Sequence, residues 1–323
     1  MDDFKFSTPA SLANYIDKQG EIDEKFGNSL HSISSLDRLD FYDANFVLFG
    51  IPSLSCEHNK FVYKPCKIES LLEKFLNIQN NQFNSPDDLI LLGEIDLKSH
   101  VHHLNQDELS NEEKIKNFQN KLQDLILYIT SQIRSAGKLP IMIGGQPNNM
   151  PGSANDIEKG SDKASNVLIV SSTSDFYFSD ELPETASGHL SLSQFEKCYA
   201  FGLHKNNIRQ LHLKATHNSK QIKLMFYEDL FHLTTLDKCV KFKNAMDFLN
   251  GDFSFQLNLN AIQNKSSASL STFGFSNRDL RTFIKVIKTE GVSCFHLCGF
   301  EGLDLEHLRY ELSYIISDFI RKK

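Results

Sequence analysis

The chain has 323 residues, of which 40% are hydrophobic and 23% are charged, so it can bury a sizeable core and is not expected to be disordered. Its formal net charge of -7 argues against nucleic acid and anionic membranes as partners, because neither attracts an acidic protein. The sequence does not open on a basic segment followed by an apolar one, and it contains no long uncharged apolar run. We therefore expect a cytoplasmic protein that neither enters nor crosses a membrane.

The six cysteines are spaced neither as a disulfide framework nor as a zinc ribbon, and we expect them to be reduced. They are Cys56, Cys66, Cys198, Cys239, Cys294 and Cys298. The closest pair, Cys294 and Cys298, lies in an apolar run typical of a buried strand. There a packing role is favoured over a redox or metal role.

Short apolar runs alternate with helical patterns along the whole chain, which is typical of an α/β fold with a mainly parallel sheet between layers of helices. The strands are predicted at residues 46–49, 89–92, 140–143, 167–170, 224–226, 253–257 and 292–297.

Three helices are predicted from apolar residues spaced three and four apart. The first covers residues 112–136 and ends at Gly137. The second covers residues 277–288 behind Ser276, a suitable N-cap, and the third covers residues 305–320.

Neither a linker nor a repeat divides these elements, so we predict one domain over residues 1–323, with residues 1–40 as an N-terminal extension. The most irregular segments, residues 146–165 and 174–193, each follow a predicted strand. In an open α/β sheet, ligands bind at the carboxyl ends of the strands, and these loops are where a site is expected.

Three short motifs follow predicted strands: GGQPN at residues 144–148, SSTSD at 171–175 and NLNAIQ at 258–263. In order and spacing they resemble the motifs GGDHS, DAHxD and DxDxxD of the ureohydrolase family, which contains arginase, agmatinase and formimidoylglutamase. Weaker similarities extend the resemblance over residues 45–320. They are FGIP at residues 49–52, LGEI at 92–95 and FHLCG at 295–299.

The resemblance implies a three-layer α/β/α arginase-like fold with a mainly parallel central sheet. It also implies the family's chemistry, in which two manganese ions share a bridging hydroxide that attacks a guanidinium or formimino carbon. Hard dications prefer carboxylate and imidazole ligands, and their combined charge lowers the pKa of the bound water. Family members usually form homotrimers or hexamers.

Carried over residue by residue, the resemblance places most metal-ligand positions on side chains that bind dications poorly. These positions are Pro147, Ser171, Thr173, Asp175, Asn258 and Asn260. The late glutamate that orients the family's substrates is replaced by Gly299. The remaining pocket positions implied by the resemblance are Gln146, Gln263, His189 and Glu301.

These replacements remove negative charge. Four carboxylates would balance the four positive charges of two dications, whereas Asp175 supplies a single negative charge. We therefore expect no cofactor and a catalytically inactive protein, a pseudoenzyme that serves as a scaffold or binds a small polar or cationic ligand. The resemblance also implies a homo-oligomer, a trimer or hexamer, or assembly with an active paralogue.

Other interpretations remain open. His100 and His102 would share a face in an extended chain and could hold a shifted or mononuclear metal site, which would leave an active hydrolase of a guanidino or formimino C-N bond. A solvated loop is favoured for this segment. A serine triad with His189 and Asp175 lacks the G-x-S-x-G elbow, and Gly144-Gly145 is not a nucleotide-binding fingerprint. A resemblance of fold alone, with an unrelated role, is the last alternative.

Overall fold

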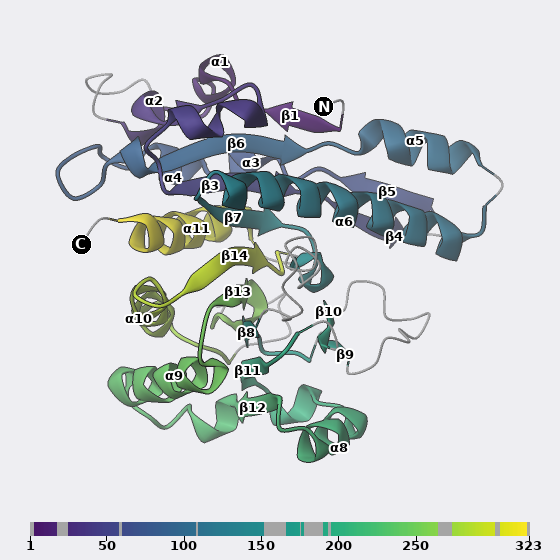
Figure 1. The fold of residues 1–323 in the computed structure, drawn as a ribbon, viewed down its shortest axis with the longest axis vertical. Helices are drawn as coiled ribbons and strands as arrows, with labels where there is room; N and C mark the ends of the chain where they lie inside the picture. The colour runs from purple at the N-terminus through teal and green to yellow at the C-terminus, as the bar shows by residue number, and fades with distance from the viewer. Residues whose placement is uncertain are drawn as a thin grey trace. The chain divides into compact units, whose positions relative to one another are not determined.

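A computed structural model describes the parts of the chain that Figure 1 draws as ribbon. They are residues 3–17, 25–57, 60–107, 109–151, 166–174, 176–177, 190–192, 195–263, 273–300 and 304–321. Contacts group the chain into two compact units: unit 1 is residues 1–145 with 305–323, and unit 2 is residues 146–304. The single domain predicted from the sequence stays a prediction.

Unit 1 is built on a mainly parallel sheet whose central strand, β6, is buried along its whole length. Strand β6 pairs in parallel with β3, and β3 pairs in parallel with β7. Two short strands from the first 40 residues also pair with β6, β1 antiparallel and β2 parallel. The bounds are β1 Phe4–Phe6, β2 His31–Ser32, β3 Phe46–Ile51, β6 Leu89–Ile95 and β7 Leu139–Gly144.

The longest helix of unit 1 is α6 (Asn111–Ser135), which begins at a capping box of Ser110 and Glu113 and packs on β7. Gly137, with φ +70°, follows its C-terminus, where a left-handed residue is favourable. A hairpin and further helices complete the unit. They are β4 Ser53–Glu57, β5 Lys60–Lys64, α1 Pro9–Leu12, α2 Phe26–Ser29, α3 Ile68–Leu71, α4 Glu73–Leu76, α5 Lys98–Gln106 and α11 Leu305–Ile320.

Unit 2 contains a five-stranded parallel sheet in the order β14-β13-β8-β11-β12. Its three inner strands, β13, β8 and β11, are buried at every position, because helices cover a parallel sheet on both faces. The bounds are β8 Asn166–Val170, β11 Cys198–Leu203, β12 Ile222–Phe226, β13 Phe253–Asn258 and β14 Val292–Cys298. A short pair, β9 Phe176–Tyr177 and β10 Leu190–Ser191, lies outside this sheet.

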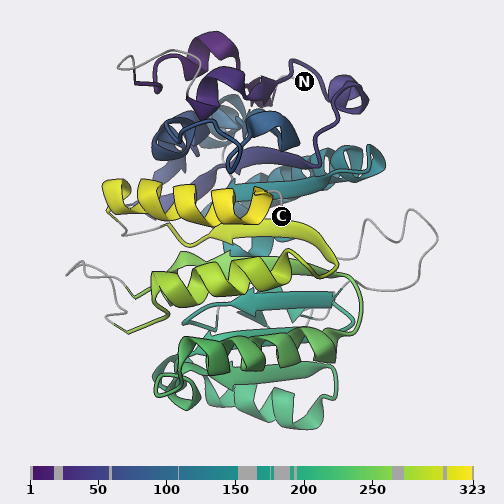
Figure 2. The same ribbon diagram turned by 90° about the vertical axis from the view of Figure 1, so that its left-hand side faces the viewer.

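Helices α9 (Thr235–Leu249) and α10 (Asn277–Ile287) lie side by side on one face of the unit 2 sheet, as Figure 2 shows. A third helix, α8 (Gln210–Asn218), packs on β12. A buried ion pair joins α9 to α10, with Lys238 Nζ 2.9 Å from Asp279 Oδ2. Burial alone would raise the pKa of Asp279, but hydrogen bonds from Thr235, Lys238 and Ser276 outweigh it and lower the pKa.

The seven predicted strands and three predicted helices are confirmed, and so are the Ser276 cap and the buried positions of Cys294 and Cys298. The sequence patterns missed β11, although all six of its residues are buried, and α9, whose apolar face is weakly defined. Within the described ranges, none of the helices has both the length and the hydropathy that a membrane crossing requires.

Candidate functional site

The strand order of unit 2 changes direction between β8 and β13. From β8 the chain proceeds through β11 to β12 on one side, and it then returns to β13 and β14 on the other. Because β8 and β13 are adjacent and parallel, the loops that follow them, residues 171–174 and 258–263, leave the sheet at the same edge. Such a switch point is where open α/β sheets place their ligand sites.

Asn260 is the centre of a hydrogen-bond network that joins these two loops. Its Oδ1 atom accepts hydrogen bonds from the Ser172 backbone N–H at 3.0 Å and from Ser171 Oγ at 3.2 Å. Its Nδ2 atom donates to Thr173 Oγ1 at 2.6 Å. One amide therefore donates to and accepts from three neighbours on the other loop, and each of these partners is electrically neutral.

Asn258 stabilises the backbone of the loop at residues 258–263. Its side chain is 3% exposed, and its Oδ1 atom accepts a hydrogen bond from the backbone N–H of Asn260 at 3.1 Å. This contact is an N-cap of the short turn Leu259–Ala261. The amide that stands in place of the first aspartate of DxDxxD thus fixes the backbone that carries Asn260.

Gly299 lies directly against the side chain of Asn258. Its φ is +77°, a conformation that L residues with side chains rarely adopt, and a Cβ atom added there would lie 1.8 Å from Asn258 Oδ1. The backbone at this position has no room for the glutamate that the ureohydrolase resemblance places there.

Two polar side chains inside the strands reach the same region, although the sequence patterns did not select them. Gln256 is 1% exposed on β13, and its Nε2 atom donates to the backbone oxygen of Pro147 at 2.8 Å. The same atom lies 3.2 Å from Nδ1 of His296, a fully buried residue of β14 that pairs directly with Gln256. A polar residue within an otherwise apolar strand is the signal that could have identified both.

The described residues of the site surround a small pocket at the edge of the sheet. It is lined by Pro147, Ile169, Ser171, Thr173, Phe176, Gln256 and Asn258. The side chains pack so closely that the space between them does not admit a water-sized sphere. The loops that the sequence predicted to converge therefore do converge, and they fill most of the space at their meeting point.

The other predicted positions lie less centrally or outside the described residues. Gln146 is half-buried, and its backbone N–H donates to Asn149 Oδ1 at 2.6 Å. Gln263 is exposed, with its backbone paired to Phe275. Three predicted positions lie outside the described residues: Asp175, His189 and Glu301.

The histidine cluster of unit 1 is helical, which corrects both the extended chain and the loop considered from the sequence. Helix α5 contains His100, His102 and His103, and residues two apart in a helix point in different directions. His102 is exposed, and its Nε2 atom contacts Gln106 Nε2 at 3.1 Å. More broadly, the described residues contain no group of three or more His, Cys, Asp or Glu side chains that could hold a metal ion.

Comparison with known proteins gives matches of structure only: no protein-family model and no curated protein sequence matches the chain. The fold is similar to formiminoglutamase from Trypanosoma cruzi, solved with Mn2+2, at 16% identity and a TM-score of 0.63 over 92% of this chain and 99% of that one. It is also similar to the agmatine ureohydrolase of Thermoplasma volcanium, at 13% identity and a TM-score of 0.59 over 92% of this chain and 93% of that one. Arginase from Bacillus cereus gives 9% identity and a TM-score of 0.57 over 87% of this chain and 99% of that one.

Identities this low show the fold alone. The chain has the three-layer α/β/α arginase-like fold of the ureohydrolases, with a mainly parallel sheet, as the sequence resemblance predicted. It is divergent in sequence from each of these structures.

Proposed function

We propose that this chain is a catalytically inactive relative of the ureohydrolases, in which a neutral hydrogen-bond network has replaced the dinuclear manganese site. The observation that carries the proposal is the set of contacts made by the Asn260 amide, which connect the loop after β13 to the loop after β8. In this arrangement the positions that resemble metal ligands bind one another.

Charge supports this proposal. A dication needs anionic or strongly donating ligands to replace its hydration shell, and a neutral amide or hydroxyl is a much weaker partner. Ser171, Thr173 and Asn260 are neutral at every physiological pH, and the proline at position 147 has no side-chain donor atom. The described donor set therefore does not fit two manganese ions.

Space supports it as well. An attacking water needs a position within about 3 to 3.5 Å of the reacting carbon, held by a group that takes its proton. The pocket between Pro147, Ser171 and Asn258 does not admit a water-sized sphere, and its described side chains include no carboxylate or imidazole. Gly299 further excludes the glutamate that would orient a cationic substrate.

What remains is a folded scaffold with a small polar surface at the switch point. This fits assembly with copies of itself or with an active paralogue, or weak binding of a small polar ligand. The alternative, an active hydrolase with a shifted or mononuclear metal site, finds no support among the described residues, because α5 turns His100 and His102 in different directions and no group of three potential ligands is found there.

The test is metal analysis combined with activity. The full chain is purified, incubated with excess Mn2+ at neutral pH, desalted, and analysed by mass spectrometry for bound metal. We expect less than one manganese per chain, and no release of urea, ammonia or formamide from arginine, agmatine or formimidoylglutamate. The formiminoglutamase from Trypanosoma cruzi, carried through the same steps, is the positive control.

Two outcomes would overturn the proposal: two tightly bound manganese ions per chain, or turnover that a chelator abolishes. An Asp175→Asn variant then identifies the location of the metal. Loss of metal in this variant places the metal at the switch point, whereas retention directs attention to His100 and His102 as ligands of a shifted site.

A further inference from the structure

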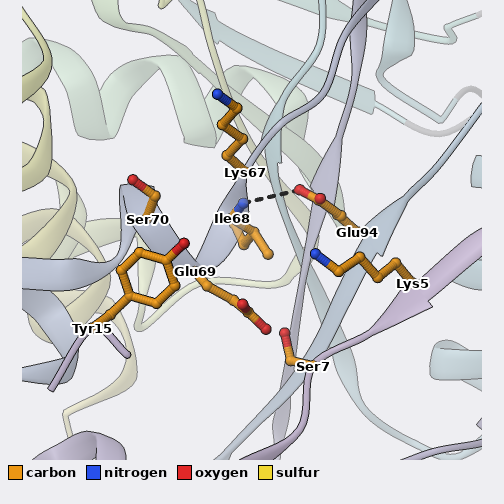
Figure 3. Close-up of a pocket in the computed structure, with 8 residues that line it drawn as sticks. All are labelled: Lys5, Ser7, Tyr15, Lys67, Ile68, Glu69, Ser70 and Glu94. Atoms are coloured by element: carbon orange, nitrogen blue, oxygen red, sulfur yellow. Dashed lines mark hydrogen bonds between the residues drawn. The ribbon is translucent and has the colours of Figure 1, made fainter. Parts of the chain in front are cut away.

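Unit 1 contains a second pocket, formed by residues far apart in the sequence, which neither the motifs nor the proposed function uses. The pocket has a volume of about 70 Å³ and opens to solvent. Figure 3 shows its lining residues: Lys5, Ser7, Tyr15, Lys67, Ile68, Glu69, Ser70 and Glu94. This volume suits the charged end of a small molecule, and because the pocket is open, the rest of such a molecule would extend into solvent.

Two buried carboxylates face this pocket. Glu69 is 9% exposed and accepts a hydrogen bond from Ser11 Oγ at 2.5 Å. Glu94 is 7% exposed and accepts one from the backbone N–H of Ile68 at 3.0 Å, drawn as the dashed line in Figure 3. Both side chains are therefore removed from bulk water and held in place.

Within the described part of the chain, neither carboxylate forms an ion pair. By contrast, the buried carboxylate of Asp279 in unit 2 is paired with Lys238. Buried charges are normally paired, because a buried carboxylate without a cation loses its hydration and gains little in return. Burial raises the pKa of Glu94 above its ordinary value, although the backbone N–H groups of Ile68 and Lys67 and the positive charge of Lys5 act in the opposite direction. Two buried carboxylates thus share one nearby ammonium, and a further cation that entered the pocket would balance the second negative charge.

Positive charge is also present, but at the rim. Lys5 and Lys67 are both exposed, and neither ammonium forms an ion pair with Glu69 or Glu94. In Figure 3 the Lys5 ammonium points towards the space between Ile68 and Glu94, whereas Lys67 extends away from the carboxylates. The pocket thus combines two buried carboxylates with one inward-pointing ammonium.

We propose that this pocket binds a small zwitterion of the α-amino acid class. The ligand's ammonium group would lie between Glu69 and Glu94, and its carboxylate would face Lys5. The Lys5 ammonium disfavours a metal dication, the buried acids disfavour an anion, and a simple amine would leave Lys5 without a partner.

The experiment is isothermal titration calorimetry on the full chain with each of the twenty standard amino acids. For the tightest binder, two analogues are then measured: the amine without the carboxylate, and the acid without the amine. We expect at least one amino acid to bind below about 10 mM and both analogues to bind at least about tenfold more weakly, since each lacks one charge contact. Failure of all twenty to bind, or equal binding of the amine, would overturn the proposal.

Variants locate the site. Glu69→Gln and Lys5→Met each remove one charge, and each should weaken amino acid binding by about fivefold or more. Lys116→Met removes an equally exposed lysine of unit 1 that does not line the pocket, and binding should be unchanged. Because Lys5 is exposed, its variant keeps the test valid even if Glu69→Gln impairs folding; unchanged binding in Lys5→Met would contradict the assignment.

Discussion

Two polar regions of this protein differ in how their polar groups are paired. At the switch point of unit 2, neutral side chains such as Asn258 and Asn260 hydrogen-bond to neighbouring residues. In the pocket of unit 1, the carboxylates of Glu69 and Glu94 are buried and form no ion pair among the described residues. The first region is closed by hydrogen bonds between its own residues, whereas the second is the pocket for which we propose a charged ligand.

The difference shows that polar residues at a ligand-binding position in a fold do not by themselves make a ligand site. A network whose donors and acceptors are matched internally gains little from a ligand, because binding would exchange one set of hydrogen bonds for another. A buried charge without a counter-charge gains more. The family resemblance predicts a site in unit 2, yet the buried carboxylates that form no ion pair, Glu69 and Glu94, lie in unit 1.

The largest expected effect tests how tightly the switch point is closed. Gly299→Ala should lower the free energy of unfolding by about 3 kcal/mol, because the new Cβ must displace Asn258 in addition to adopting a left-handed backbone. Gly137→Ala is the matched control: its φ is +70°, but a Cβ atom added there would have no other atom within 4 Å. It should cost only about 1 kcal/mol for backbone strain.

Urea denaturation of both variants measures the difference. Equal losses in Gly299→Ala and Gly137→Ala would mean that the side chain of Asn258 yields freely. The switch point would then be adaptable, and its contrast with the pocket of unit 1 would be weaker.

The next effect concerns the network itself. Asn260→Ala removes the acceptor for Ser172 and Ser171 and the donor to Thr173, and it should lower the free energy of unfolding by about 2 kcal/mol. Asn117→Ala, at an exposed position of α6, should change it by less than about 0.5 kcal/mol. Thermal or urea unfolding compares the two, and a loss no larger than that of Asn117→Ala would show that the network is not stabilising.

The smallest effect is a pH dependence that distinguishes buried from exposed carboxylates. Burial raises the pKa of Glu94, so between its unfolded and folded pKa values the native state binds more protons than the unfolded state. Its contribution to stability is therefore present at low pH and lost as the pH rises above about 4.3 through the raised value. Glu94→Gln should remove this loss, with a change of about 1 kcal/mol or less.

Glu113 provides the opposite sign. Hydrogen bonds from the backbone N–H and the hydroxyl of Ser110 lower its pKa, so its contribution is present at neutral pH and lost as the pH falls through the lowered value. The free energy of unfolding is measured with urea between pH 3 and 7 for wild type, Glu94→Gln and Glu113→Gln. The two substitutions should change its pH dependence in opposite directions. The same direction in both variants would contradict the burial of an uncompensated charge at Glu94.

The sequence by itself determined the fold class and the order of the site loops. Apolar periodicity identified α6, α10 and α11, and the caps at Ser110 and Ser276 act within a few residues of the chain. The motifs at residues 144–148, 171–175 and 258–263 keep their order behind three strands, which sufficed to predict the arginase-like fold. Each of these features is either a local pattern or the order of several local patterns along the chain. They can therefore be recognised without the contacts between distant segments.

Only the tertiary structure decided which polar groups are satisfied. Asn260 meets Ser171 across 89 positions of the sequence, and the charged pocket brings Lys5 near Glu69 and Glu94 from separate elements. Gln256 and His296 are adjacent because β13 and β14 pair in one particular register. Hydrogen bonding and burial depend on distances of a few ångströms between distant segments, and a pattern along the chain does not contain those distances.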